Sequence, residues 1–359
     1  MTIGSVEKYI TDTAWEEGWV VPVAPIAERT ESVGIIGAGP GGLAAAERLR
    51  AAGVQVTVYD RYDRAGGLLT YGIPGFKLEK DVVMRRIDQL EQGGVAFRLN
   101  CSVGEDIDFA EIRGAHDAVL IATGVYKSRD LPAPGVGAAG VVRALDFLTA
   151  SNRKSFGDTV PEFDSGELNA EGKRIVVIGG GDTAMDCVRT AIRQGATSVK
   201  CLYRRDKANM PGSQREVQNA EEEGVDFVWL SAPVGFQGDH VTGVMVQKMR
   251  LGAPDATGRQ MPEVIDGSDY VEGADLVIKA LGFEPEELPK LWGENGLEVT
   301  RWGTIKADFR THATTLENVY AVGDIVRGAS LVVWAIRDGR EAADAILDKM
   351  GAGALVAAE

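Results

Sequence analysis

Two glycine-rich turns limit the folds that this chain can adopt. The first follows the apolar run 33–36 and reads Gly37-Ala38-Gly39-Pro40-Gly41-Gly42, and the second follows the run 174–178 and reads Gly179-Gly180-Gly181-Asp182-Thr183-Ala184. A helix-favouring stretch comes after each turn, at 43–52 in the first case. Strand, glycine turn and helix in this order are typical of a unit that binds a dinucleotide. We therefore predict two such units, one holding its dinucleotide tightly and one whose dinucleotide comes and goes.

Each glycine of the first turn has a separate task in this interpretation. Gly37 permits the tight turn out of the strand, Gly39 leaves room for a pyrophosphate, and Gly42 lets the helix pack closely on the strand. The pyrophosphate is then expected at the free N–H groups of the helix N-terminus. Asp60 stands at the end of the next apolar run, where its carboxylate can accept hydrogen bonds from both ribose hydroxyls. The first site therefore favours a ribose without a 2′-phosphate.

The second turn carries Ala184 in place of the third glycine, and its next strand ends in Arg204 and Arg205, with Lys207 close behind. A planar guanidinium group matches a 2′-phosphate, which a carboxylate would repel. The second site therefore predicts NADPH, although a basic pair can also be a solvated face. Asp182 and Thr183 fit two interpretations equally well, contact with the pyrophosphate or capping of the helix.

Composition excludes several other classes of function. The formal net charge of −15 argues against nucleic-acid or anionic-membrane partners. No apolar run approaches the roughly 18 residues of a membrane span, and residues 1–28 lack a secretory apolar core, so a cytoplasmic protein is expected. Cys101, Cys187 and Cys201 form no C-x-x-C pair, and the histidines are scattered. Neither a metal site, an iron–sulfur cluster nor a redox dithiol is predicted, and the cysteines are interpreted as buried thiols.

The remaining pattern predicts the order of the domains. The strand 118–124 ends in Ala122-Thr123-Gly124, and the strand 274–280 with Leu281-Gly282 echoes it, which indicates a diverged internal duplication. A third such strand, 318–324, ends in Gly323-Asp324 and is followed by a helical stretch at 331–350, as at the end of the first unit. We predict an α/β fold of two Rossmann-like domains, the second inserted into the first. The expected parts are a lead-in at 1–30, the first domain at 31–150 and 303–359, and the NADPH-binding domain at 151–302.

The segment 66–77 is too rich in glycine for a helix and too apolar for a solvent-exposed linker. We interpret it as a loop that lies against a flat ring, with a packed surface loop as the alternative.

Nearly the whole chain resembles one family of enzymes. The residues that carry the resemblance are 37–42, 59–61, 66–77, 122–124, 179–186, 203–215, 278–283 and 321–338. They are similar to the FAD and NADPH part of the small (β) subunit of bacterial NADPH-dependent glutamate synthase, to the amino-terminal region of dihydropyrimidine dehydrogenase and, more distantly, to adrenodoxin reductase. In the family an amino-terminal iron–sulfur domain precedes this part, whereas this sequence starts at the segment 2–9 that would follow it. The chain is then either a natural homologue without that domain or an excised piece. The NADPH-to-flavin reaction is expected in both cases, whereas the formation of glutamate stays open.

The resemblance implies FAD in the first unit and NADPH in the second, with hydride passing from nicotinamide C4 to flavin N5. Positioning supplies most of the catalysis, so no catalytic acid or base is expected. The N–H groups of Ala329, Ser330 and Leu331 are expected to face the negative charge near flavin N1, and Asp324 to bind the ribityl or phosphate region or else to cap the approach to a helix. The expected FAD residues are Gly37, Ala38, Gly39, Pro40, Gly42, Asp60, Arg61, Gly67, Leu68, Ile73, Pro74, Lys77, Val103, Ala122, Thr123, Gly124, Gly323, Asp324, Ala329, Ser330 and Leu331. The expected NADPH residues are Gly180, Gly181, Asp182, Thr183, Arg204, Arg205, Ala280, Leu281 and Gly282.

The family also implies an electron-acceptor protein similar to the large subunit of glutamate synthase. Two alternatives stay open, a stand-alone NADPH reductase of a small-molecule or quinone acceptor and a non-catalytic assembly subunit.

Overall fold

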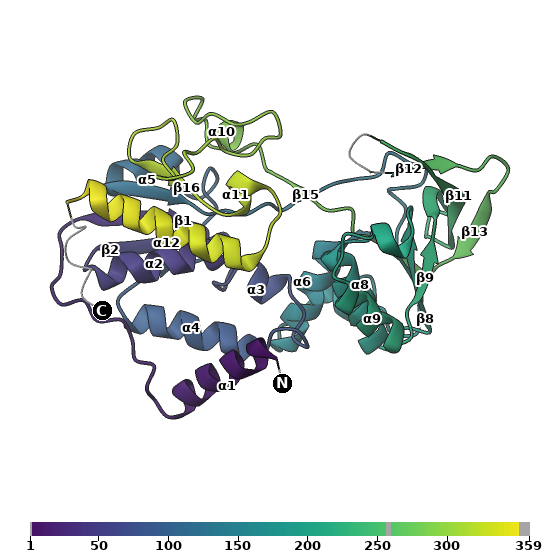
Figure 1. Cartoon of the computed structure of the whole chain (residues 1–359), viewed down its shortest axis with the longest axis horizontal. Helices are drawn as coiled ribbons and strands as arrows, with labels where there is room; N and C mark the ends of the chain where they lie inside the picture. Colours follow the sequence, from purple (N-terminus) through teal and green to yellow (C-terminus); the bar gives the residue numbers. More distant parts are fainter. Residues whose placement is uncertain (1, 256–259, 352–359) are drawn as a thin grey trace. The chain divides into compact units, whose positions relative to one another are not determined.

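The computed structural model describes residues 2–255 and 260–351 and divides the chain into two compact units (Figure 1). Unit 1 comprises Met1–Leu69, Lys80–Val125 and Pro285–Glu359, and unit 2 comprises Thr70–Glu79 and Tyr126–Glu284. The chain therefore leaves unit 1 twice and returns to it twice. The second excursion contains a complete α/β domain, which agrees with the predicted insertion.

Unit 1 is built on a parallel five-stranded sheet in the order β16-β4-β1-β2-β3. Its strands are β1 (Ser32–Ile36), β2 (Gln55–Tyr59), β3 (Ala96–Arg98), β4 (Ala118–Ile121) and β16 (Val319–Ala321). Its helices are α1 (Ile3–Glu16), α2 (Pro40–Ala51), α4 (Lys80–Gln92), α5 (Phe109–Ala115), α10 (Leu288–Leu291), α11 (Asp324–Arg327) and α12 (Val332–Lys349), and α3 (Leu68–Tyr71) crosses from unit 1 into unit 2. The edge strand β16 comes from the returning chain, so residues on both sides of the insertion complete one sheet.

The sequence explains why this sheet is parallel and covered on both faces. The four residues of β4 are all buried and apolar, without the alternation of a strand that has one face in water. Helices α2 and α12 lie side by side over the sheet (Figure 1). They approach closely because Gly41 of α2 meets Gly339 of α12, where a Cβ on Gly339 would collide with the Gly41 carbonyl oxygen.

Unit 2 repeats the arrangement with a parallel sheet in the order β6-β14-β7-β8-β9. Its sheet strands are β6 (Val141–Arg143), β7 (Arg174–Ile178), β8 (Ser198–Tyr203), β9 (Asp226–Trp229) and β14 (Leu276–Lys279). Its helices are α6 (Ala144–Ser155), α7 (Pro161–Asp164), α8 (Asp182–Arg193), the 3-10 turn η1 (Lys207–Asn209) and α9 (Gln214–Glu222). The position of β14 beside β7 matches that of β4 beside β1, so the structure agrees with an internal duplication.

A smaller antiparallel sheet lies between β9 and β14 in the chain. It consists of β10 (Ser231–Gln237), β11 (Gly243–Pro254), β12 (Gln260–Val264) and β13 (Tyr270–Gly273). Val244 and Val246 of β11 pack with Val176 and Ile178 of β7 in one apolar cluster. Two short strands, β5 (Lys127–Ser128) and β15 (Phe283–Glu284), pair near the points where the chain enters and leaves unit 2.

The compact units change at Val125/Tyr126 and at Glu284/Pro285, whereas the sequence placed the changes after residues 150 and 302. The segment before residue 150 lies in unit 2 because β6 pairs with β14, and Phe147 and Leu148 of α6 are buried in its core. The segment after residue 285 lies in unit 1 because Leu288 and Leu297 pack in the core beside β4 and β16. The polar composition of 151–172 suggested that the chain crosses between domains there. These residues instead form the end of α6, α7 and the turns around them.

No helix within the described ranges is both long and apolar enough to cross a membrane.

Candidate functional site

The first glycine turn connects β1 to α2 and has the geometry that its sequence predicts. Gly37 has φ +109°, and a Cβ there would collide with the carbonyl oxygen of Ala122 at the end of β4. A Cβ on Gly42 would collide with the carbonyl oxygen of Gly37, so this glycine allows the close approach of helix and strand. In contrast, no described atom lies within 4 Å of a Cβ built on Gly39. The turn is therefore tightly packed on two sides and open at Gly39, before Pro40 starts the helix.

Asp60 follows β2 and is only 9% exposed. Its Oδ2 accepts the N–H of Ala38 at 2.7 Å, and its Oδ1 accepts the N–H of Tyr62 at 2.9 Å. Burial raises the pKa of this carboxyl, against the opposing effect of the two N–H groups. Asp60 thus ties the turn to the end of β2, and each oxygen retains a lone pair with which it could also meet a ribose hydroxyl.

The end of β4 supplies a polar atom with no partner. Thr123 follows Ala122, and its Oγ1 is buried and has no hydrogen-bond partner among the described residues. Because buried hydroxyl groups are normally hydrogen-bonded, an unpaired one beside an open glycine turn fits a bound polar ligand. The residues present at this edge of the sheet therefore fit a dinucleotide.

Asp324 and Ser330, two of the expected FAD residues in the returning part of unit 1, contact each other. Asp324 opens α11 after Gly323, and its carboxylate accepts the backbone N–H of Ser330. Burial raises the pKa of Asp324 to about 6, with Asp338 adding to the shift and Ser330 opposing it. One of the N–H groups expected to face the flavin thus donates to Asp324 in this structure. Ala329 and Leu331 are exposed, and the last helix begins at Val332.

Several other expected FAD residues make contacts that the sequence did not indicate. Arg61 pairs with Glu286 at 2.9 Å, and Val103 is partly buried against the core of unit 1. The segment expected to be a loop contains the short helix α3, since Leu68–Tyr71 makes one helical turn directly after Gly67. Ile73, Pro74 and Lys77 lie in unit 2.

The second glycine turn connects β7 to α8 and repeats the geometry of the first. A Cβ on Gly179, at φ +150°, would collide with the Ala280 carbonyl oxygen, just as Gly37 meets Ala122. No described atom lies within 4 Å of a Cβ built on Gly181. The third position tolerates Ala184, whose side chain is fully buried in the core. Gly180 packs under the ring of Tyr203, where a Cβ would meet the ring carbons.

A cavity of about 670 Å³ opens in front of this turn. Among the residues that line it are Gly179, Gly180, Gly181, Thr183, Arg204, Arg205, Ala280, Leu281 and Gly282. The sequence predicted all but the first of these as site residues. It missed Arg129 and Asp130, which also line the cavity and belong to no motif, and Tyr203 and Asn209, which lie in the range 203–215 but were not assigned to the site. Asp130 pairs with Lys279 at 2.7 Å, a contact between residues too far apart in the chain for a sequence pattern to indicate.

Arg205 lines this cavity with guanidinium nitrogens that have no partner in the described part of the chain. Its Nε and Nη2 are buried and have no hydrogen-bond partner among the described residues, whereas Lys207 is held by both oxygens of Glu221. Arg204 is exposed at the same cavity. Buried guanidinium nitrogens without an acceptor are costly unless an anion meets them. The cavity therefore fits a ligand with a phosphate group at this end.

Neither Asp182 nor Thr183 caps α8. The capping position is Gly181, which has no side chain to donate or accept, and Asp182 Oδ1 instead accepts the N–H of Ser213 at 3.0 Å. Asp182 thereby joins the glycine turn to the start of α9.

All three cysteines are free and buried. Burial raises the pKa of the Cys201 thiol to about 12 and raises the pKa values of Cys101 and Cys187 as well. A thiol with a raised pKa is a poor nucleophile, so these side chains serve the packing of the core.

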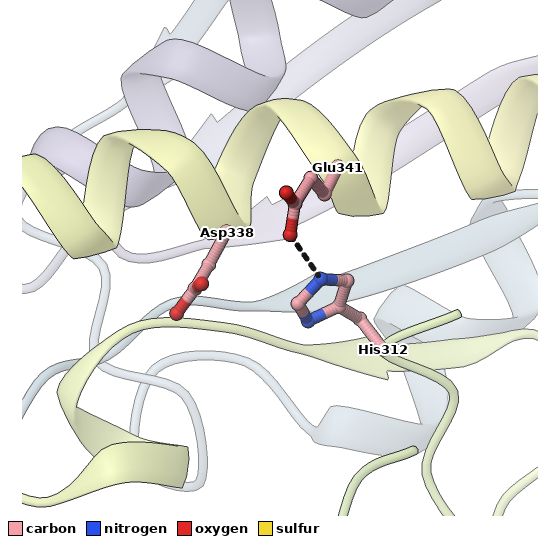
Figure 2. A group of neighbouring side chains, drawn as sticks. All are labelled: His312, Asp338 and Glu341. Atoms are coloured by element: carbon pink, nitrogen blue, oxygen red, sulfur yellow. Dashed lines mark ion pairs between the residues drawn. The ribbon is translucent and has the colours of Figure 1, made fainter. Parts of the chain in front are cut away.

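One histidine has neighbours that its sequence did not indicate. His312 lies near Asp338 and Glu341 of α12 (Figure 2), and its Nε2 is 3.6 Å from a Glu341 oxygen. Both carboxylates already face guanidinium groups, Asp338 through two 2.6 Å bonds from Arg327 and Glu341 through one 2.6 Å bond from Arg337. A divalent cation would be repelled by these two arginines, so we interpret the cluster as an ion-pair network.

The chain is similar to known proteins in family, in sequence and in fold. The family described as pyridine nucleotide-disulphide oxidoreductase matches residues 31–339. A putative glutamate synthase [NADPH] small chain of Cereibacter sphaeroides is 79% identical over 100% of this chain and 86% of its own length. The glutamate synthase [NADPH] small chain of Azospirillum brasilense is 65% identical over 96% of this chain and 72% of its own. FprA of Mycobacterium tuberculosis shares the fold, with a TM-score of 0.76, 20% identity and coverage of 90% and 85% of the two chains.

The two glycine turns and the paired parallel sheets are those of a pyridine-nucleotide oxidoreductase with two dinucleotide-binding domains. Within that class, the chain belongs to the family of glutamate synthase [NADPH] small chains. The fold class predicted from the sequence is confirmed. So is the function in its general form, a flavin-dependent NADPH oxidoreductase with FAD and NADPH as its cofactors.

Proposed function

We propose that unit 1 binds FAD at the Gly37–Gly42 turn and that unit 2 binds NADPH in the cavity at the Gly179–Ala184 turn. The assignment of unit 2 depends on one observation above all, the two buried and unpaired guanidinium nitrogens of Arg205 in a cavity that the open Gly181 turn also lines. A 2′-phosphate supplies the acceptor that Arg205 lacks. The buried Asp60 occupies the corresponding strand end in unit 1, which favours an unmodified ribose there.

The chain's own residues bind and orient the two cofactors in this proposal. When bound, FAD supplies the hydride-accepting chemistry and NADPH supplies the hydride. The N–H groups at the start of α2 and α8 face the two pyrophosphates, and the open positions at Gly39 and Gly181 admit them. Thr123 Oγ1 is free to hydrogen-bond a ligand at the end of β4. No proton has to be held by a side chain, so the rate depends on positioning.

Replacing Arg204 and Arg205 together with alanine tests the assignment of unit 2. We expect the transition-state free energy for NADPH oxidation to rise by about 2–4 kcal/mol, the value of lost charge-assisted bonds, and that for NADH to change by less than about 1 kcal/mol. The measurement is kcat/KM for dye reduction with each coenzyme, together with anaerobic bleaching of the flavin spectrum. Lys207→Ala is the matched control, because Glu221 already holds that lysine outside the cavity. Equal losses with both coenzymes would assign the arginines to folding instead.

We also propose that the electrons leave to an acceptor protein similar to the large chain of glutamate synthase. The names of the relatives support this partner. The proposal predicts that the chain alone reduces dyes with NADPH and that an added large chain changes the rate of NADPH oxidation. Unchanged NADPH oxidation with the large chain present, and efficient turnover with a quinone instead, would favour the stand-alone reductase.

A further inference from the structure

The segment 70–79 belongs to unit 2, although the chain on both sides of it belongs to unit 1. Within this segment, the Lys77 ammonium group forms two ion pairs. Its Nζ is 2.8 Å from Asp186 Oδ1 of α8 and 3.3 Å from Glu216 Oε2 of α9. The carbonyl oxygen of Tyr71 accepts a 2.9 Å hydrogen bond from Asn152 Nδ2 of α6. Three helices of unit 2 therefore hold this segment.

The ion pairs around Lys77 are shielded from solvent. The side chains of Lys77, Asp186 and Glu216 are 25%, 12% and 17% exposed. Arg189 of α8 continues the network to Glu216 at 2.8 Å and to Glu223 at 2.7 Å. Burial alone would lower the pKa of Lys77, but the hydrogen bond and charge of Asp186 and the charge of Glu216 raise it, so the ammonium stays charged at neutral pH.

Phe76 adds an apolar contact to this attachment. Its ring contacts two guanidinium groups of α8, with the Arg189 and Arg193 Cζ atoms 4.7 and 4.3 Å from the ring centroid. Cation–π contacts of this kind are most favourable where water is partly excluded. Segment 70–79 is thus held to one face of α8 by both charge and stacking.

The same helix begins at the proposed NADPH cavity. Asp186 lies one turn along α8 from Asp182, which follows Gly181 and accepts the N–H of Ser213 at the start of α9. The glycine turn, α8, α9 and segment 70–79 are therefore joined through short polar contacts within one unit. The sequence had assigned Lys77 to cofactor binding, but its charge is already compensated by two carboxylates.

We propose that Lys77 is a positioning residue that fixes segment 70–79 to the NADPH-binding unit, so that the segment moves with α8 and α9 rather than with the sheet of unit 1. The inference rests on the proposed function, in which unit 2 binds NADPH, and on the interpretation of 66–77 as a segment that lies against a flat ring. The hinge points are then Leu69/Thr70 and Glu79/Lys80, where the chain changes units. Lys77 thereby sets the position of this segment relative to the NADPH bound in the same unit.

The test compares the flavin-loaded protein with its Lys77→Met variant by hydrogen exchange and by stopped-flow flavin reduction. We expect amides of 70–79 to exchange about tenfold faster or more in the variant, because the buried network that closes the segment is broken. The limiting rate of flavin bleaching should fall about tenfold, while the NADPH concentration for half-maximal rate changes less than about threefold, since positioning and not binding is lost. Lys77→Arg should restore both values.

Two further variants keep the result interpretable. Lys77→Met with Asp186→Asn removes both charges of the 2.8 Å pair, and Arg189 still pairs with Glu216, so the double variant should fold even if the single variant does not. It should show the same fast exchange in 70–79. Lys154→Met removes a lysine ion pair with Asp164 elsewhere in unit 2 and should change neither readout. Normal exchange and a normal bleaching rate in the double variant would overturn the proposal. If instead NADP⁺ protects no amides of 179–184 in the unaltered protein, the proposed NADPH site fails, whereas the exchange of 70–79 without ligand still tests the attachment.

Discussion

Gly39 and Gly42 are three positions apart in the same turn, but a side chain would have different effects at the two positions. The space beside Gly39 is open, so Gly39→Val should leave the unfolding free energy of the flavin-free protein nearly unchanged and abolish FAD binding, because the side chain would fill the place of the pyrophosphate. Gly42→Val should instead reduce that free energy by at least about 1–3 kcal/mol through the collision with Gly37.

Urea unfolding and the flavin absorbance of the purified variants measure the two effects separately. A Gly39→Val protein that purifies with a full complement of flavin would show that the pyrophosphate lies elsewhere.

The raised pKa of Asp324 predicts a pH dependence of stability. Burial raises this pKa from 3.8 to about 6. A carboxyl group with a raised folded-state pKa stabilises the fold below about pH 4, and this contribution is lost as the pH rises through about 6. Asp324→Asn lacks the titration but keeps an acceptor for the Ser330 N–H. Between about pH 4 and pH 7 the flavin-free variant should therefore gain stability relative to the unaltered protein, by on the order of 1–2 kcal/mol after solvent screening.

Urea unfolding over this pH range is the measurement. If the unfolding free energies of the two proteins changed with pH in parallel, the pKa of Asp324 would not be raised in solution.

At the residue scale, the sequence predicts the role of a residue where that role depends on its nearest neighbours in the chain. The packing at Gly37 and Gly42 and the opening at Gly39 follow from the spacing of one turn. The surroundings of Lys77 could not be predicted, because Asp186 and Glu216 are distant in sequence and lie in a different unit from most of the chain around Lys77.

At the scale of elements, the contact between α2 and α12 depends on a pair of glycines. Gly339→Ala should push the helices apart at Gly41 and lower the unfolding free energy by about 1–3 kcal/mol. Alanine has the higher helix propensity, worth about 1 kcal/mol in its favour, so a net loss identifies the collision as the cause. Arg340→Ala, at the exposed neighbouring position of α12, is the control and should change stability little. A Gly339→Ala variant more stable than the unaltered protein by the full helix-propensity gain of about 1 kcal/mol would show that the helices separate at no cost.

Elements with a continuous apolar pattern were predictable and the others were not. The strands β4, β14 and β16 and the helix α12 lie where their sequences predicted them, within a few residues at each end. The sheet β10–β13 was not predicted, because half-exposed strands such as β12 have no long apolar run. The helical turn α3 was missed because neighbouring glycines suggest a loop.

At the scale of the whole molecule, the duplication was predictable but the limits of the units were not. The limits are set by which sheet a strand joins, and β6 joins β14 by pairing that leaves no local signature. The two units nevertheless share the order of four strands, β4-β1-β2-β3 and β14-β7-β8-β9, and the same open glycine position, at Gly39 and Gly181. They should therefore bind their dinucleotides independently.

This independence can be measured as ligand-linked stability. A ligand at a hundred times its dissociation constant stabilises the state that binds it by about 2.7 kcal/mol. Gly39→Val should abolish the stabilisation by FAD and keep that by NADP⁺, and Gly181→Val should do the reverse, so each variant is the control for the other. Calorimetry of both variants, with each ligand alone, gives the four values. If either substitution abolished both effects, the two turns would form one shared site, and the assignment of one dinucleotide to each unit would be wrong.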